Sequence, residues 1–198
     1  MKLNEFSEIK KLSECAEIKT GLVLSRKKSD KIKKYRYDSL NLKSINSHGY
    51  IEKENLDPFY SKEILNEEYL TKPGDIIIRL TAPYTAVLID EDFKGIVFSS
   101  NFIKIETDSK KLVPEYLEWY LNSSKVKKHI DRQVSGTVIR AVNPGYYKNL
   151  NVELITLEKQ NKLAEISKMM KNEELLLRTL LNKKEILNKA LINEILKK

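Results

Sequence analysis

The spacing of apolar residues along the chain changes near residue 156. Before this point, short apolar runs alternate with turn-forming residues; Asp75–Leu80 (DIIIRL), for example, follows Lys72-Pro73-Gly74. After it, glycine and proline are absent up to Lys198, and the helix formers Leu, Lys, Glu, Asn and Ile dominate. We therefore predict an α+β protein with a globular mixed α/β domain over 1–156 and a long C-terminal coiled-coil helix over 157–198.

Short β-branched runs and turn residues locate the elements of the globular part. A helix is expected to begin at Pro114, because proline suits the first helical turn and apolar residues recur at helical spacing after it. The polar segment Lys27–Lys34 is expected to be an exposed loop. The predicted strands are Asp75–Leu80, Ala86–Ile89, Ile96–Glu106, Val138–Val142 and Val152–Ile155.

The long helix, predicted over about Leu157 to Leu196, carries a heptad-like stripe. Forty residues at about 1.5 Å each reach roughly 60 Å, which is more than a domain of this size can cover. We therefore predict an intermolecular coiled coil, with docking along its own domain as the alternative. The stripe follows spacings of three and four, with Glu173 and Lys184 as polar interruptions of the apolar residues Leu163, Ile166, Met170, Leu177, Leu180, Leu187 and Leu191.

An antiparallel homodimer satisfies this stripe better than a parallel one. If contacting residue numbers sum to 357, leucine, isoleucine and methionine meet one another, and Glu173 meets Lys184 twice by symmetry. A parallel in-register pair would bury like charges, Glu173 against Glu173 and Lys184 against Lys184. We predict the antiparallel arrangement, with one domain at each end.

Charge, cysteine content and the lack of long apolar runs indicate the kind of binding partner and the expected location of the protein. The formal net charge is +8, which favours a polyanionic partner such as DNA. Cys15 is the only cysteine, so no internal disulfide can form, and we expect it to be a buried small hydrophobe. The start of the chain lacks a signal peptide, and no apolar run approaches the roughly 18 residues of a membrane span. The expected location is the cytoplasm, without membrane contact.

The sequence contains only weak matches to known enzyme motifs. No two of the six glycines form a G-x-G pair, and two histidines with one cysteine make no zinc spacing. Asn143-Pro144-Gly145-Tyr146 resembles an adenine-binding loop of DNA methyltransferases, but it also reads as a turn in which Pro144 opens a short helix. Asp75 with Asp92 and Lys94 loosely matches a nuclease metal site. We predict no catalytic residue, cofactor or metal, with a solo methyltransferase, a nuclease or a non-binding scaffold as alternatives.

Three segments are candidates for DNA contact. The densest basic run suits phosphates, although a solvated loop is the competing interpretation. A strand end and a Ser-Gly-Thr segment offer arginine and threonine for base edges. The candidate residues are Arg26, Lys27, Lys28, Lys34, Tyr35 and Arg36 in the first segment, Arg79, Thr81 and Tyr84 in the second, and Thr137 and Arg140 in the third.

The order of several short motifs resembles the DNA-specificity subunit of Type I restriction-modification systems. LSECAEIKTG resembles the start of that family's target-recognition domain, and LTKPGDIIIRL, SSNFIKIE, VPEYLEWYLNS and SGTVI resemble its later segments. LITLEKQNKLA resembles the family's entry into the long conserved helix, with Thr156 in place of the usual proline. Together these segments span nearly the whole chain.

This resemblance implies a non-catalytic subunit that reads double-stranded DNA. Methyl transfer would belong to a partner modification subunit that docks partly on the long helix, and cleavage to a restriction subunit bound through it. Family members usually carry two recognition domains and two long helices, whereas this chain has one of each. Both a natural half subunit and one half of a longer subunit fit this length. The resemblance carries over neither the base-reading residues nor the spacer length of the target.

Overall fold

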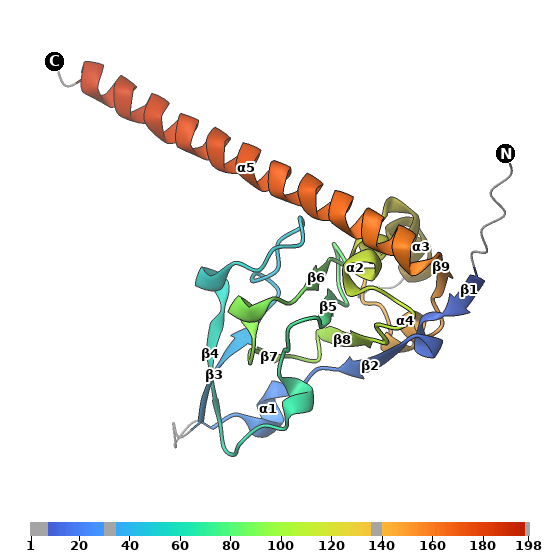
Figure 1. Cartoon of the computed structure of the whole chain (residues 1–198). Coiled ribbons are helices and arrows are strands. Elements are labelled where there is room, and N and C mark those ends of the chain that lie inside the picture. Colours follow the sequence, from blue (N-terminus) through green and yellow to red (C-terminus); the bar gives the residue numbers. More distant parts are fainter. Residues whose placement is uncertain (1–7, 30–34, 136–139, 197–198) are drawn as a thin grey trace, which may run out of the picture.

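Three small β-sheets and a long helix organise the computed structural model, which describes residues 8–29, 35–135 and 140–196 (Figure 1). The central sheet has the order β2-β8-β5-β6 and is antiparallel throughout; its strands are β2 (Ala16–Thr20), β5 (Ile76–Arg79), β6 (Ala86–Leu88) and β8 (Phe102–Thr107). The second sheet has the order β4-β3-β7, with strands β3 (Tyr35–Leu40), β4 (Asp57–Ser61) and β7 (Val97–Phe98). The third pairs β1 (Glu8–Lys11) with β9 (Asn151–Leu154).

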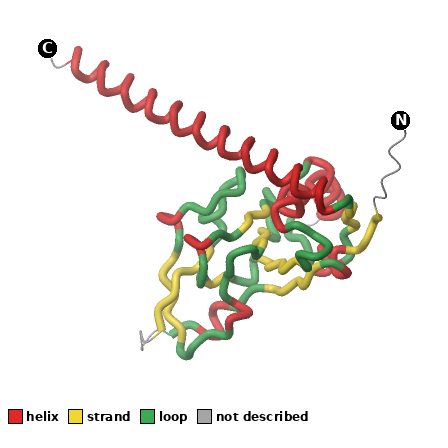
Figure 2. The backbone as a smooth tube through the Cα atoms, viewed as in Figure 1, coloured by secondary structure: helices red, strands yellow, loops and turns green. Residues whose placement is uncertain are grey.

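Most of the helical residues lie on one side of the strands, as Figure 2 shows. The helices are α1 (Leu24–Lys27), α2 (Pro114–Asn122), α3 (Ser124–Val134), α4 (Pro144–Lys148) and α5 (Leu157–Leu196). The described residues also form four short 3-10 helices, η1 (Leu12–Glu14), η2 (Lys53–Asn55), η3 (Glu67–Tyr69) and η4 (Glu91–Phe93).

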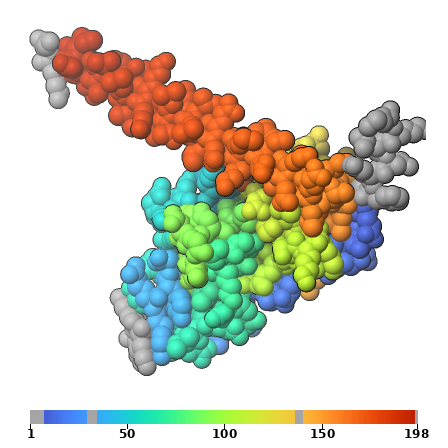
Figure 3. All heavy atoms as spheres, viewed as in Figure 1, coloured from blue at the N-terminus to red at the C-terminus, as the bar shows by residue number. Residues whose placement is uncertain are grey.

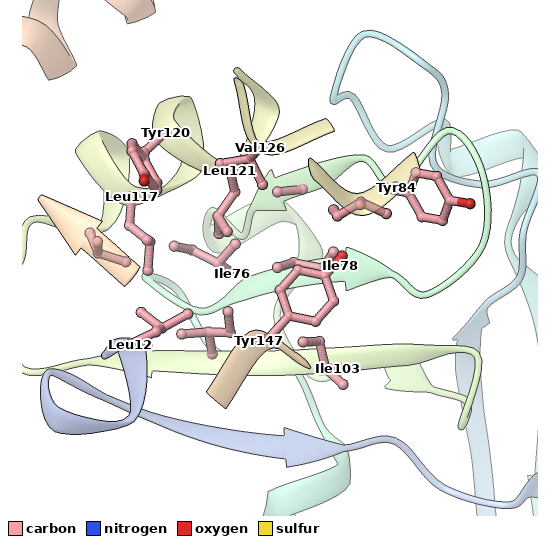
Figure 4. Packing of buried hydrophobic residues seen from close by; sticks show 14 of the residues in the cluster. Leu12, Ile76, Ile78, Tyr84, Ile103, Leu117, Tyr120, Leu121, Val126 and Tyr147 are labelled. Atoms are coloured by element: carbon pink, nitrogen blue, oxygen red, sulfur yellow. The ribbon is translucent and has the colours of Figure 1, made fainter. Parts of the chain in front are cut away.

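Strand β5 explains why three consecutive isoleucines occur together. Ile76 and Ile78 point into one cluster of buried residues with α2, α3 and α4, whereas Ile77 points into a second cluster beneath β3 and β7. All three are fully buried, because this strand is covered on both faces. Figure 4 shows Ile76, Ile78 and Ile103 packed against Leu117, Leu121 and Tyr147. Cys15 is buried in the same cluster, as expected from the sequence.

Several predicted helices and strands are confirmed, and others each correspond to two separate elements in the structure. The strands at Asp75–Leu80 and Val152–Ile155 correspond to β5 and β9. The strand predicted over Ile96–Glu106 is two strands, because a turn closed by Phe102 N donating to Ser99 O (2.9 Å) sends β7 and β8 into different sheets.

The helix predicted from Pro114 is also two helices. Ser123 leaves the helical conformation, and its hydroxyl accepts a hydrogen bond from Val126 N (3.4 Å) as the N-cap of α3. The polar segment Lys27–Lys34 was expected to be a loop, but Lys27 ends α1, and residues 30–34 lie outside the described part. Of the strand predicted at Val138–Val142, residues 140–142 are described, and Ala141 forms an isolated bridge with Thr81.

The predicted long helix is confirmed as α5, with the bounds Leu157–Leu196. Its first third docks on the globular part, where Gln160, Ala164 and Ser167 are buried. Figure 3 shows the rest projecting beyond the globular part. No helix among residues 8–29, 35–135 and 140–196 has both the length and the apolar composition of a membrane span.

Gly21 permits a close approach between two chain segments. A Cβ atom at this position would lie 2.1 Å from Ser99 O and 2.6 Å from Phe98 O, both backbone atoms. We expect Gly21→Ala to lower the free energy of unfolding by about 3 kcal/mol, because the backbone must shift to relieve this overlap.

Gly74→Ala is the matched control for this substitution, measured by the same urea titration. Gly74 has a φ of +90° but no atom within 4 Å of an added Cβ, so only backbone strain opposes the alanine. Its expected cost is about 1 kcal/mol. Equal losses in the two variants would contradict a steric role for Gly21.

Candidate nucleic-acid interface

A basic end of the globular part is built from α1 and the edge of the second sheet. The segment after α1 runs along β4, where Ser29 N donates to Tyr60 O (2.8 Å) and Lys62 N donates to Lys27 O (2.9 Å). Lys28 forms an isolated antiparallel β-bridge with Ser61, and Ser61 also pairs with Tyr35 of β3. Strand β4 therefore lies between the two ends of the first predicted contact segment and holds them on either side of it. In the view of Figure 1, α1 lies across the globular part from α5.

The basic side chains at this end differ in exposure and in their neighbours. Arg26 and Lys28 are exposed at the surface. Lys27 forms an ion pair with Glu63, and Arg36 lies 3.8 Å from Asp38. The Glu63 carboxylate raises the pKa of the Lys27 ammonium, so this lysine keeps its charge, but the acid offsets it locally. Lys34 lies outside the described residues.

A hollow of about 920 Å³ borders α1. It is bounded by α1, the β3–β4 pair and the turn between β7 and β8. Its lining is rich in groups that can donate or accept hydrogen bonds, including Ser25, Lys28, Asn41, Lys43, Ser99, Ser100 and Asn101. Asp57 also lines the hollow and accepts a hydrogen bond from Asn41 Nδ2 (2.8 Å). The cations, hydroxyls and the Asn101 amide beside it suit contact with phosphates and base edges.

The second and third predicted contact segments meet in the structure. Val142 N donates to Leu80 O (2.7 Å), and Ala141 bridges Thr81. The two segments therefore form one edge, at which Thr81 is partly exposed and Arg140 is exposed. Thr137 lies outside the described residues.

Tyr84 requires a correction to the sequence-based expectation. Its side chain is 4% exposed, and its hydroxyl donates to Arg140 O (3.2 Å). The ring lies in the core beside the residues labelled in Figure 4, so it offers no face on which a base could stack. Tyr84 supports the position of Arg140 instead. Sequence reasoning missed this role, because an aromatic residue in a loop looks the same whether it points inward or outward.

Arg79 is held by its neighbours. Its guanidinium donates to Ile45 O (3.1 Å) and Ala82 O (3.0 Å), while its Nε is buried without a hydrogen-bond partner in the structure. Burial lowers the pKa of this guanidinium from its usual value. Thr81 Oγ1 is likewise buried and unpaired. Two polar atoms at this loop, Arg79 Nε and Thr81 Oγ1, therefore form no hydrogen bond within the described structure.

The two regions adjoin. Leu80 N donates to Asn101 O (2.9 Å), and Asn101 lines the hollow beside α1. Asn41 and Lys43 also line it, and the same segment continues to Ile45, the acceptor of Arg79. We call this surface the recognition face and define it by Arg26, Lys28, Asn41, Lys43, Arg79, Thr81, Asn101 and Arg140.

The residues of the two enzyme-like motifs have structural partners. Asp75 is buried and lies 3.5 Å from Lys104 Nζ, whereas Asp92 is exposed and lies 3.4 Å from Lys53 Nζ. Asn143 is the N-cap of α4, and its Oδ1 accepts from Gly145 N (2.8 Å), which confirms the turn predicted there. Within the described residues, no group of three or more His, Cys, Asp or Glu side chains is placed to hold a metal ion.

The predicted stripe on α5 faces away from the globular part. At 100° per residue, the docked residues Gln160, Ala164, Ser167 and Lys171 lie on one face, and the stripe is centred roughly 140° round the helix. Leu163 is the exception, because it packs against the domain core. The other apolar members of the stripe are 49–64% exposed; they are Ile166, Met170, Leu177, Leu180, Leu187 and Leu191. We call these six residues, with Glu173 and Lys184, the open stripe.

Solved structures with this fold come from restriction-modification systems. One is the HsdS subunit from Thermoanaerobacter tengcongensis, with a TM-score of 0.67 and 19% identity, covering 91% of this chain and 46% of that one. Another, from a study of complex assembly and conformational transition in a type I system, has a TM-score of 0.67 and 19% identity, covering 90% and 45%. The S subunit from M. genitalium has a TM-score of 0.56 and 13% identity, covering 85% and 40%.

These similarities establish the fold over about nine-tenths of the chain. The chain spans less than half the length of each of these structures. No protein-family profile and no curated protein sequence matches it. The α+β fold with a long C-terminal helix, predicted from the spacing of apolar residues, is thus confirmed, and it is the fold of type I specificity subunits.

Proposed function

We propose that this chain reads a specific sequence in double-stranded DNA as the specificity component of a Type I restriction-modification complex. The observation that carries the proposal is the recognition face, which gathers cations, amides and hydroxyls from segments far apart in the sequence. Cations there would contact phosphates and set affinity, while Arg79, Thr81 and Arg140 would contact base edges. The solved structures with this fold, among them an HsdS subunit and the S subunit of a type I restriction-modification system, support the same role.

We further propose that the chain has no catalytic centre of its own. Methyl transfer would be performed by a partner modification subunit that docks partly on α5, and cleavage by a restriction subunit bound through it. The residues of the two enzyme-like motifs support this division, because Asp75 is paired with Lys104 and Asn143 caps a helix.

The proposed quaternary arrangement is an antiparallel homodimer through α5. The open stripe supports it, since apolar residues there are uncovered on the face opposite the docked one. In the register that sums to 357, Leu177 meets Leu180, and Glu173 meets Lys184. Two-fold symmetry would make the target an inverted repeat interrupted by a spacer that is not read.

The triple variant Lys27→Ala, Lys28→Ala and Lys34→Ala tests DNA contact by the basic end. We expect affinity to fall at least about tenfold near 0.15 M salt, equally for all sequences, because phosphate contacts carry no sequence information. The slope of log affinity against log salt should also become shallower, by less than about 3, since Lys27 is already paired with Glu63.

Its control removes three lysines of α5 that lie off the open stripe, by Lys168→Ala, Lys183→Ala and Lys189→Ala. This variant has the same net charge as the first, so a general charge effect would weaken both equally. Gel mobility shifts on selected and random duplexes give both affinities. Unchanged binding by the first variant would remove the basic end from the interface.

The absence of catalysis is tested with tritiated S-adenosylmethionine. We expect no transfer of label to DNA by the purified chain, and transfer after a modification subunit of a type I system is added. Label transferred by the chain alone would contradict the proposal, and the solo methyltransferase would then be the better assignment.

Charge reversal within the open stripe tests the dimer. Glu173→Lys places a lysine against Lys184 twice, and we expect the dimer to weaken about tenfold or more, roughly 1.4 kcal/mol. Adding Lys184→Glu should restore it, because the two charges are then exchanged. Sedimentation equilibrium of the three proteins measures the effect. A wild type that is monomeric at micromolar concentration, or a double variant no tighter than the single one, would rule out this register.

A further inference from the structure

A group of contacts fastens α5 to the globular part at the point where the helix leaves it. At its centre, Lys171 of α5 forms an ion pair with Glu118 of α2, whose side chain is only 6% exposed. The Tyr50 hydroxyl donates to Lys171 O (2.6 Å), and the Lys171 ammonium lies 6.0 Å from the centre of the Tyr50 ring. One residue of α5 is thus held through both its side chain and its backbone.

A second layer of contacts lies one turn further along the helix. His48 Nδ1 is 3.2 Å from Glu174 Oε1 and 3.0 Å from an Arg178 guanidinium nitrogen. Arg178 also donates to Glu174 (2.7 Å). We call the six residues the clamp: Tyr50, Glu118 and Lys171 in the inner layer, and His48, Glu174 and Arg178 in the outer layer.

The inner layer depends on charge balance within a buried site. Burial raises the pKa of the Glu118 carboxyl, and the Lys171 ammonium opposes this rise. Asn122 adds a hydrogen bond to the same carboxylate (3.3 Å). Removing only one member would leave a buried charge without its partner, whereas removing both leaves neutral groups.

The loop that supplies Tyr50 and His48 is itself well ordered by hydrogen bonds. Asn46 Oδ1 accepts from His48 N (3.0 Å) and Tyr50 N (3.2 Å). Gly49 has a φ of +82°, and an added Cβ would lie 3.4 Å from Lys171 Nζ. These contacts restrict the conformation of the loop, so His48 and Tyr50 are held in defined positions against α5.

The same segment reaches the recognition face. Asn41 and Lys43 line the hollow, Ile45 O accepts from Arg79, and Tyr50 holds α5. A single stretch of ten residues thus joins the base-reading surface to the helix. The tilt of α5 relative to the recognition face is fixed through this stretch and α2.

Small changes of this tilt would have large effects at the far end of the helix. About 37 Å of helix lies beyond Lys171, at about 1.5 Å per residue. A tilt of 10° would move its end by roughly 6 Å, close to two base-pair steps of about 3.4 Å. In the proposed dimer the second domain is carried at that end.

We propose that the clamp determines the spacer length that the dimer accepts, with Tyr50, Glu118 and Lys171 as positioning residues that act through the tilt of α5. This inference rests on the proposed homodimer and DNA-reading function. Helix length alone cannot select one spacer, because a domain that pivots on its helix would reach half-sites at several separations. The clamp removes that freedom.

The test uses duplexes that carry the selected half-site twice, inverted, with spacers that differ by one base pair. We expect the wild type to bind one spacer at least about tenfold better than its neighbours. In the variant Glu118→Gln with Lys171→Met, this preference should fall to about threefold or less, because the paired charges are replaced by neutral side chains of similar length. Affinity for a duplex with a single half-site should not change.

Two further variants separate positioning from general damage. Glu158→Gln with Lys162→Met removes an exposed ion pair between two residues of α5 outside the clamp, and it should keep the wild-type preference. Tyr50→Phe removes only the hydrogen bond to Lys171 O, and it should broaden the preference less than the double variant. A clamp variant with an undiminished spacer preference would overturn the inference while leaving the proposed function intact.

A distance measurement tests the clamp without DNA. Spin labels at Glu91→Cys and Lys183→Cys report the distance from the globular part to the free half of α5, and Cys15 is buried and escapes labelling. With labelled protein diluted in unlabelled protein, the distance distribution should be narrow in wild type and broader in the double variant. Failure of the wild type to bind DNA would defeat the proposed function. An unbroadened distribution would defeat the clamp.

Discussion

The burial of Gln160 determines where the long helix starts and how it lies. Its side-chain oxygen accepts from Val113 N (2.8 Å), and its side-chain nitrogen donates to Lys111 O (3.0 Å) and Ile155 O (2.9 Å). One fully buried amide thus joins the first turn of α5, the entry to α2 and the end of β9. Because each of its polar atoms is satisfied, the site tolerates burial that would otherwise be costly. Ala164 and Ser167 then keep the two helices close.

Two surfaces of different chemistry follow from this anchoring. The recognition face is polar and basic, whereas the open stripe is apolar with two charges in it. The docked face of α5 lies between them in the fold, and the segment from Asn41 to Tyr50 connects the recognition face to that docked face. The proposed DNA-reading dimer needs these surfaces to be rigid with respect to one another, and we propose that the contacts of the clamp provide that rigidity.

The sequence predicted elements whose signal is local. The bounds of α5 and the position of β5 follow from composition and apolar runs, and Asn143 with Pro144 marks the start of α4. It did not predict β3 or β4, because β3 begins inside the basic run and β4 contains Pro58, a residue that is disfavoured within strands. The meeting of Thr81 with Ala141, and of Tyr50 with Lys171, depends on contacts between residues far apart in the chain. No local pattern encodes such pairs, so the clamp, and the way the predicted contact residues come together in the recognition face, emerged only from the structure.

The pairing of β1 with β9 has a consequence for the order of events during synthesis. Residues 8–11 find their partners at 151–154, so this sheet closes only after nearly the whole globular part has left the ribosome. Helix α5 emerges immediately afterwards, onto a docking face that already exists. Its uncovered leucines therefore meet a nearly completed domain rather than an unfolded one, which shortens the time in which they could drive aggregation.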